Sequence, residues 1–227
     1  MQKYLDTLMV CPLFEGIGEG GLLNTLTCLG AHVRRCEKGE TILAEGEPVR
    51  YLGIVLSGTV QIVRMGYDGS RSILVRLDPT GLFGEAYACA GMTAMPASAV
   101  AAERAEALLI GAERILHPCA HPCGFHHQMI YNLMRILATK NLALHRRAEI
   151  TAQRTTRGKL MTYLALQAAQ AGSRSFDIPF DRQELADYLG VDRSGLSAEI
   201  GRLRREGVLA CTRSHFTLLA GGEGADA

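Results

Sequence analysis

The chain of 227 residues carries 24 Lys and Arg residues against 23 Asp and Glu residues, a formal net charge of +1. This balance excludes a strongly basic protein, so any contact with nucleic acid must come from a local patch. No apolar run reaches the ~18 residues of a membrane-spanning helix, and Lys3 and Asp6 argue against a secretory signal. The seven cysteines are scattered and odd in number, unlike a disulfide framework. We therefore expect a soluble, cytoplasmic protein whose thiols are free, metal-bound or redox-active.

The first half of the chain has the pattern of a small β-rich domain. Residues 2–29 predict a short helical lead-in with breaks at Pro12 and at residues 16–21. After it come short apolar segments separated by Gly and Asp turns. The candidate strands are residues 33–35, 40–44, 53–57, 59–65, 72–77 and 108–110. Short strands at this spacing predict an antiparallel β-roll or jelly roll over residues 1–124.

Residues 125–150 predict one long helix with two apolar stripes. The stripes recur at helical spacing: Ile130, Leu133, Leu137 and Leu144 in one, and Met129, Ile136, Ala143 and Ile150 in the other. A helix that is apolar on two faces must bury both. One face can cover the β-roll and the other can pair with a second copy, so we expect a dimerisation helix. A lone helix that fills a large core is the alternative.

Residues 180–207 predict two short helices joined by a turn. Asp181 and Glu184 form a capping-box start. Gly190 stands where the first helix must end, and Asp192 is a second N-cap. Two short helices with a Gly-containing turn form a helix-turn-helix. An ordinary helical hairpin with a solvated basic face is the alternative.

The second of these helices has one buried and one exposed face. Leu196, Ile200 and Leu203 recur at helical spacing and predict the buried stripe. The opposite face carries small, polar and basic side chains, which suit a helix lying in a major groove. The residues that we predict to contact DNA are Arg182, Asp192, Arg193, Ser194, Ser197, Ala198, Arg202 and Arg205.

The elements around the helix-turn-helix favour a winged domain over residues 151–220. Residues 156–171 predict an amphipathic helix, and residues 176–180 predict a short strand. Residues 208–219 predict a strand hairpin directly after the second helix, as in a winged helix. The Gly-rich residues 221–227 predict a disordered tail.

Three motifs occur in a specific order. They are residues 53–63 (GIVLSGTVQIV), 81–85 (GLFGE) and 182–197 (RQELADYLGVDRSGLS). A β-roll, a long helix and a winged helix-turn-helix in this order resemble the Crp/Fnr family of bacterial transcription regulators. The resemblance covers nearly the whole chain and implies an α+β fold. The only histidine in or next to the candidate strands is His32, and no nucleophile–base pair has a helpful local spacing, so we expect no enzymatic activity. The resemblance further implies a homodimer that binds a palindromic double-stranded operator, with RNA polymerase as a candidate partner and no membrane.

The resemblance also implies an effector between the β-roll and the long helix. In members that bind cyclic nucleotides, a Gly-Glu pair is followed about ten residues later by Arg-Ser, and the guanidinium neutralises the cyclic phosphate. Gly84 and Glu85 match this pair, but residues 94–98 (AMPAS) contain no arginine. A buried phosphate without a cation is costly, so we expect a small effector other than cyclic AMP. The predicted effector-pocket residues are Gly84, Glu85, Ala97, Ser98, Tyr131 and Met134.

The second helix of the helix-turn-helix departs from the family as well. Many members use Arg, Glu and a later Arg to recognise their half-site. Arg193 matches the first of these, while Ser194 stands at the Glu position and Ala198 at the second Arg. Arg193 can still bind a guanine through O6 and N7. We therefore expect an operator that differs from the best-known one of the family.

Cysteines and histidines gather between residues 117 and 127 (HPCAHPCGFHH). Cys119, His121, Cys123 and His126 are candidate ligands of zinc, iron or haem. Their spacing differs from standard zinc motifs, and the alternative is ordinary buried residues at a helix start. A metal-, haem- or redox-sensing regulator is therefore a second hypothesis. A signalling module that regulates a protein partner without binding DNA is a third.

Overall fold

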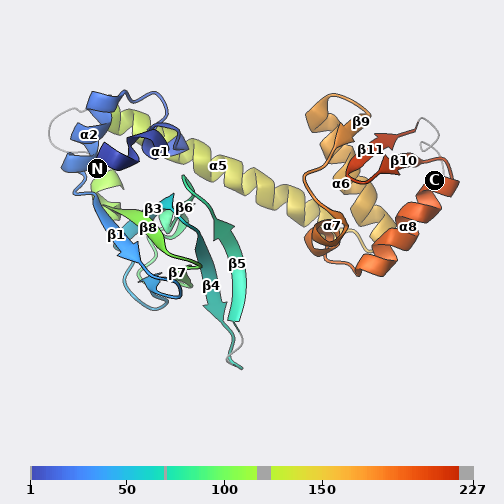
Figure 1. The fold of residues 1–227 in the computed structure, drawn as a ribbon, viewed down its shortest axis with the longest axis horizontal. Coiled ribbons are helices and arrows are strands. Elements are labelled where there is room, and N and C mark those ends of the chain that lie inside the picture. The colour runs from blue at the N-terminus through green and yellow to red at the C-terminus, as the bar shows by residue number, and fades with distance from the viewer. Residues whose placement is uncertain (1, 69–70, 117–123, 220–227) are drawn as a thin grey trace. The chain divides into compact units, whose positions relative to one another are not determined.

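The computed structural model describes residues 2–68, 71–116 and 124–219. The chain divides into two compact units, Met1–Thr139 and Lys140–Ala227 (Figure 1). Helix α5 (Gly124–Ala152) contributes its first part to one unit and its last part to the other. Within the described ranges, no helix combines the length and apolarity that crossing a membrane requires. The predicted tail, residues 221–227, lies outside the described residues.

The first unit begins with short helical segments: η1 (Gln2–Tyr4), α1 (Leu5–Met9), η2 (Pro12–Phe14) and α2 (Glu19–Cys28). Pro12 begins η2, where its fixed φ is compatible with helix and its missing N–H is not needed. The buried Asn132 of α5 donates hydrogen bonds to the carbonyl oxygens of Leu13 (3.1 Å) and Glu15 (2.8 Å). Arg135 adds an ion pair to the Glu15 carboxylate at 3.1 Å. These bonds join the lead-in to the first part of α5.

Two four-stranded antiparallel sheets form the β-roll. One has the order β1 (His32–Cys36), β8 (Ala105–Gly111), β3 (Tyr51–Ser57) and β6 (Leu82–Phe83). The other has the order β2 (Thr41–Leu43), β7 (Ser98–Ala101), β4 (Val60–Met65) and β5 (Arg71–Leu77). A short helix, α3 (Glu85–Cys89), connects β6 to β7, and a second, α4 (Ala112–Leu116), follows β8. The six predicted strands are confirmed, with shifted ends; β6 and β7 were not predicted.

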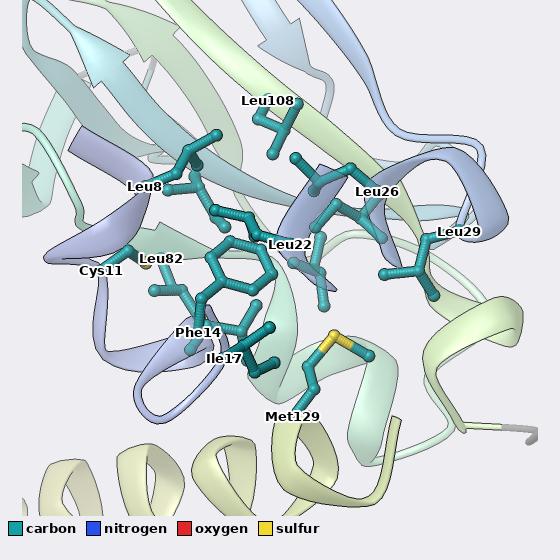
Figure 2. Close-up of a cluster of buried hydrophobic side chains, with 14 of the residues drawn as sticks. Leu8, Cys11, Phe14, Ile17, Leu22, Leu26, Leu29, Leu82, Leu108 and Met129 are labelled. Atoms are coloured by element: carbon teal, nitrogen blue, oxygen red, sulfur yellow. The ribbon is translucent and has the colours of Figure 1, made fainter. Parts of the chain in front are cut away.

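Strand β3 separates two apolar clusters because its side chains alternate between the two faces of the sheet. Leu52, Ile54 and Leu56 join a cluster on the side of the lead-in helices. Figure 2 shows this cluster, in which Phe14, Leu22 and Met129 come from three different elements. Val55 instead belongs to a second cluster between the two sheets.

The space between the sheets is filled by side chains of the chain itself. Five of them are alanines: Ala97, Ala99, Ala101, Ala105 and Ala107. Phe83 and Met95, two larger side chains of this cluster, are only 2% and 3% exposed. A Cβ on Gly53 would lie 2.1 Å from Cζ of Phe83, so only glycine allows this ring to pack here.

The second unit is a helix-turn-helix with a three-stranded sheet. Its elements after α5 are α6 (Thr156–Ala171), β9 (Ser175–Asp177), α7 (Arg182–Leu189), α8 (Arg193–Arg205), β10 (Leu209–Thr212) and β11 (His215–Leu218). The sheet order is β10, β11, β9, with both pairs antiparallel. Leu160, Leu196 and Phe216 are fully buried in one core that also contains Ile150 of α5. The predicted helix over residues 156–171 is confirmed, and the predicted strand over 176–180 is shorter and lies one residue earlier.

Helix α5 buries only part of its two predicted stripes. Met129, Leu133 and Ile150 are buried, but Leu144 is 66% exposed. Three other apolar side chains of α5 are exposed on a different side of the helix. The exposed fractions of Tyr131, Met134 and Leu142 are 53%, 57% and 59%. Together with the exposed Ala138 they recur every three or four residues and form one stripe. We call Tyr131, Met134, Ala138 and Leu142 the exposed stripe of α5.

Candidate nucleic-acid interface

The two helices of the helix-turn-helix are capped as their sequence predicts. The Asp181 carboxylate accepts hydrogen bonds from the backbone N–H groups of Gln183 (2.8 Å) and Glu184 (2.9 Å). Glu184 in turn accepts from the Asp181 N–H at 2.8 Å, which completes the capping box. Gly190 ends α7 with φ at 61°, a left-handed conformation that favours glycine. These caps fix where α7 begins and ends, and Asp192 caps the start of α8.

The buried face of α8 fixes its rotation about its own axis. Leu196 and Leu203 are fully buried and Ile200 is 4% exposed, so the predicted stripe is confirmed. Lys159 of α6 donates a hydrogen bond to the Gly190 carbonyl at 3.3 Å and holds the turn against the rest of the unit. With one face in the core, the opposite face of α8 must point to solvent.

The predicted DNA-contacting residues of α8 and its N-cap are exposed, whereas Arg182 lies half-buried on α7. The basic residues differ in their partners. Arg193 has no hydrogen-bond or ion-pair partner for its guanidinium within the described ranges. Arg205, in the same ranges, donates only to the Gly201 carbonyl, at 3.4 Å. Arg202 instead forms ion pairs with Glu199 (3.1 Å) and Glu206 (3.5 Å). Ser197 and Ala198 are exposed between these arginines.

Asp192 and Ser194 are engaged in the N-cap of α8. The Asp192 carboxylate accepts hydrogen bonds from the Ser194 hydroxyl and, at 2.9 Å, from the Gly195 N–H. The Ser194 bond, followed by that from Gly195, holds the pKa of Asp192 below its usual value. Asp192 thus remains a carboxylate that orients the first turn of α8.

Arg182 joins the start of α7 to the wing formed by β10 and β11. Its guanidinium lies 5.8 Å from the ring centre of Phe216 and donates to the Arg213 carbonyl at 3.5 Å. Arg213 occupies the two-residue turn of the wing with φ at 54°. A cavity of about 390 Å³ lies beside both arginines and is also lined by Phe180 and Ser214. Arg213 was not predicted from the sequence, because a single arginine in a loop gives no periodic signal.

The predicted effector-pocket residues fall into two groups. Gly84 begins α3 with φ at 78°, and Glu85 and Ala97 are 3% and 2% exposed. The half-buried Ser98 accepts a hydrogen bond from the Glu45 N–H at 2.9 Å. Tyr131 and Met134 are exposed instead, on the side of α5 opposite the buried Met129. Gly84, Glu85, Ala97 and Ser98 thus lie in the β-roll, whereas Tyr131 and Met134 lie on the exposed side of α5.

The predicted metal ligands lie largely outside the described residues. Cys119, His121 and Cys123 fall in the segment 117–123. His126 is described: it is 4% exposed, and its Nε2 lies 2.8 Å from the Ile115 carbonyl oxygen. Across the described ranges, no three His, Cys, Asp or Glu side chains cluster as metal ligands would. The metal hypothesis stays a prediction.

Two family models match the chain, one in each of its two parts. Residues 33–121 match the family described as cyclic nucleotide-binding domain. Residues 158–220 match the Crp-like helix-turn-helix domain, which contains α7, α8 and the wing. The chain belongs to the Crp/Fnr family of transcription regulators. It is therefore a DNA-binding regulator of transcription, as its motifs predicted.

Similar proteins align with most of the chain. The transcriptional activator protein FnrL of Cereibacter sphaeroides is 22% identical over 191 residues, which cover 79% of this chain and 73% of FnrL. A probable transcriptional activator of Rhizobium leguminosarum bv. viciae is 27% identical over 188 residues, or 78% of this chain and 72% of that protein. The crystal structure of DNR from Pseudomonas aeruginosa superposes with a TM-score of 0.52 at 21% identity, covering 97% and 96% of the two chains. This last likeness supports the fold alone.

The segment 94–98 (AMPAS), which contains no arginine, is anchored in the β-roll. Met95 and Ala97 are 3% and 2% exposed and pack between the sheets. The Met95 backbone accepts a hydrogen bond from the Gly46 N–H at 2.9 Å and donates one to the Glu47 carbonyl at 2.8 Å. This segment therefore buries apolar side chains and offers no guanidinium.

Proposed function

We propose that the regulator is a cytoplasmic homodimer that recognises a palindromic operator and responds to a small effector other than cyclic AMP. The observation that carries the DNA-binding part is the exposed face of α8. There Arg193 and Arg205 lack acidic partners among the described residues, next to an N-cap that fixes the first turn. A basic, capped helix end that lies at the surface suits base edges in a major groove.

Within this proposal the other surface residues have distinct roles. Arg193 contacts a base, while Arg205 and Arg182 contact phosphates, which add affinity without sequence preference. Asp192 acts by positioning the helix start, because its carboxylate is already bonded by Ser194 and Gly195. Arg202 must exchange its ion pairs with Glu199 and Glu206 before it can bind a phosphate.

The dimer is supported by the exposed stripe of α5. Tyr131, Met134 and Leu142 are each more than half exposed, which is unusual for large apolar side chains at regular helical spacing. The same stripe on a second copy is the partner of matching chemistry. Two copies of α8 would then contact two half-sites about 34 Å apart, one turn of B-DNA.

The experiment is a selection of bound duplexes from a random DNA pool with the purified protein. We expect an inverted repeat to be enriched and then bound at least about 10³-fold more tightly than a scrambled duplex at physiological salt. Addition of cyclic AMP should leave this affinity unchanged. Absence of an enriched motif would overturn the DNA-binding proposal. A cyclic AMP response would overturn the proposed effector class.

A further inference from the structure

A groove of about 450 Å³ opens between β1, β2 and the start of β3. Its volume falls within the range of small-molecule sites, about 300 to 1,000 Å³. Ile42 and Leu109 form an apolar floor, being 2% and 3% exposed. His32, Arg34, Arg50 and Tyr51 are polar or basic lining residues. The groove thus combines an apolar floor with a basic rim.

Arg34 is held in place at this rim by the backbone. Its Nη1 donates to the Ile42 carbonyl at 2.8 Å, and its Nη2 donates to the Thr41 carbonyl at 2.9 Å. A guanidinium has five N–H donors, so these bonds leave three for a ligand. Because the carbonyl oxygens carry no full charge, the positive charge of Arg34 stays uncompensated.

Arg50 supplies a second cation without a partner. It is exposed, and no ion pair or hydrogen bond of its guanidinium occurs among residues 2–68, 71–116 and 124–219. The groove also contains the Glu47 carboxylate, which accepts a 3.4 Å hydrogen bond from the Ala44 N–H of its own loop. The positive charges of the two arginines exceed the negative charge of the one carboxylate, so the groove favours an anion.

His32 and Tyr51 add a preorganised aromatic wall. Their ring centres are 5.4 Å apart with an interplanar angle of 82°, an edge-to-face pair. Such a wall offers apolar contact to the body of a ligand, while the imidazole and the phenol offer polar atoms at its edge.

The groove lies next to the two segments in which the sequence predicts effector residues. A Cβ on Gly84 would lie 3.0 Å from the Tyr51 carbonyl oxygen, so the Gly84 turn packs directly on β3. Pro48 forms a bridge with Ala94, and Met95 bonds the same loop on both sides. A ligand bound against Tyr51 and Pro48 would therefore lie against residues that contact both segments.

We propose that this groove is the effector site and binds a small organic anion, a carboxylate or phosphate with an apolar body. Arg34 and Arg50 bind its charged oxygens, and its apolar body lies on Ile42 and Leu109 beside the aromatic pair. This proposal names the ligand class within the proposed function. It rests on that function only for the claim that the bound anion acts as an effector. Binding of the anion is measurable without DNA.

The test is calorimetric titration of the full chain, free of DNA, with benzoate and with phenyl phosphate. We expect saturable binding of at least one of them, and the stronger of the two identifies the charged group. Neutral benzamide should bind about tenfold more weakly or not at all. Arg50→Gln should weaken anion binding by about tenfold or more, while Arg64→Gln, a matched exposed arginine on β4, should not change it.

Three results would overturn the anion site. They are absence of saturable binding by either anion, equal binding of benzamide, and wild-type binding by Arg50→Gln. Operator binding is measured separately on the same preparations. Loss of the anion site with intact operator binding refutes the groove alone, whereas absent operator binding with an intact anion site refutes the proposed function alone.

Discussion

Arg193 and Arg202 lie on the same helix, but their charges are not equally available. Arg202 is paired with Glu199 and Glu206, whereas Arg193 has no partner in the described part of the chain. Exposed ion pairs contribute little to stability, but they must be exchanged before a phosphate can bind. At the scale of single residues, we therefore assign base recognition to Arg193.

Arg193→Ala should weaken binding to the selected operator by about 1–3 kcal/mol and relax one base position. The measurement is fluorescence anisotropy on the operator and on each single-base variant. Arg205→Ala is the matched control: it should weaken binding to all sequences and lower the salt slope by about 1. Unchanged operator affinity and specificity in Arg193→Ala would refute its assignment.

The ion pairs of Glu106 offer a test of how charge interactions stabilise the β-roll. It forms ion pairs with Lys3 and Arg35, each at 3.0 Å. The hydrogen bond from Lys3 is the largest cause that lowers the pKa of Glu106 from 4.5 to about 2. Because the folded-state pKa is depressed, this stabilisation is present above the ordinary pKa of 4.5 and is lost as pH falls toward 2.

Glu106→Gln should therefore destabilise the first unit at pH 7 by on the order of 1 kcal/mol. It should also flatten the pH dependence of stability between pH 4.5 and 2. Urea unfolding at several pH values gives both quantities. Glu37→Gln is the control, because its ion pair with Arg104 is longer, 3.7 Å, and more exposed. Equal effects of the two substitutions would contradict the role of Glu106.

At the scale of elements, α5 carries the proposed dimer contact. Met134→Glu places a charge in the exposed stripe and should shift the protein to monomer, because a charge buried at a helix pair is costly. Light scattering measures the mass directly. Leu144→Glu is the control, since Leu144 is equally apolar and 66% exposed but lies off the stripe. A Met134→Glu dimer would place the interface elsewhere.

The elements that sequence predicted best are those with a local physical signal. The capping box at Asp181 and the stripe of Leu196, Ile200 and Leu203 were predictable because both depend on residues a few positions apart. Strand β7 was missed because its sequence, SAVA, is nearly uniform in size and polarity. The exposed stripe of α5 was missed because which apolar face packs on the β-roll depends on tertiary contacts.

The same difference between local signals and tertiary contacts holds for the candidate sites. The outward face of α8 follows from its buried stripe, so its residues could be named from the sequence. The groove could not be named from the sequence, because His32, Tyr51 and Leu109 come from separate strands that only the sheet pairing brings together. Arg213 could not be predicted from the sequence either, since its position beside Arg182 depends on the turn of the wing.

At the scale of the whole molecule, the proposed dimer places two copies of the chain on one operator. In this proposal the α8 helix of each copy recognises one half-site, and the exposed stripe of α5 joins the copies. An effector at the β-roll would then change DNA binding by shifting how the two DNA-binding units are oriented.

The most direct test is the mass of the complex on the selected operator, measured by light scattering coupled to size-exclusion chromatography. A homodimer on a palindromic operator predicts two chains per duplex on the inverted repeat and loss of the complex when one half-site is scrambled. A complex of one chain per duplex, or a stoichiometry unaffected by scrambling, would contradict it.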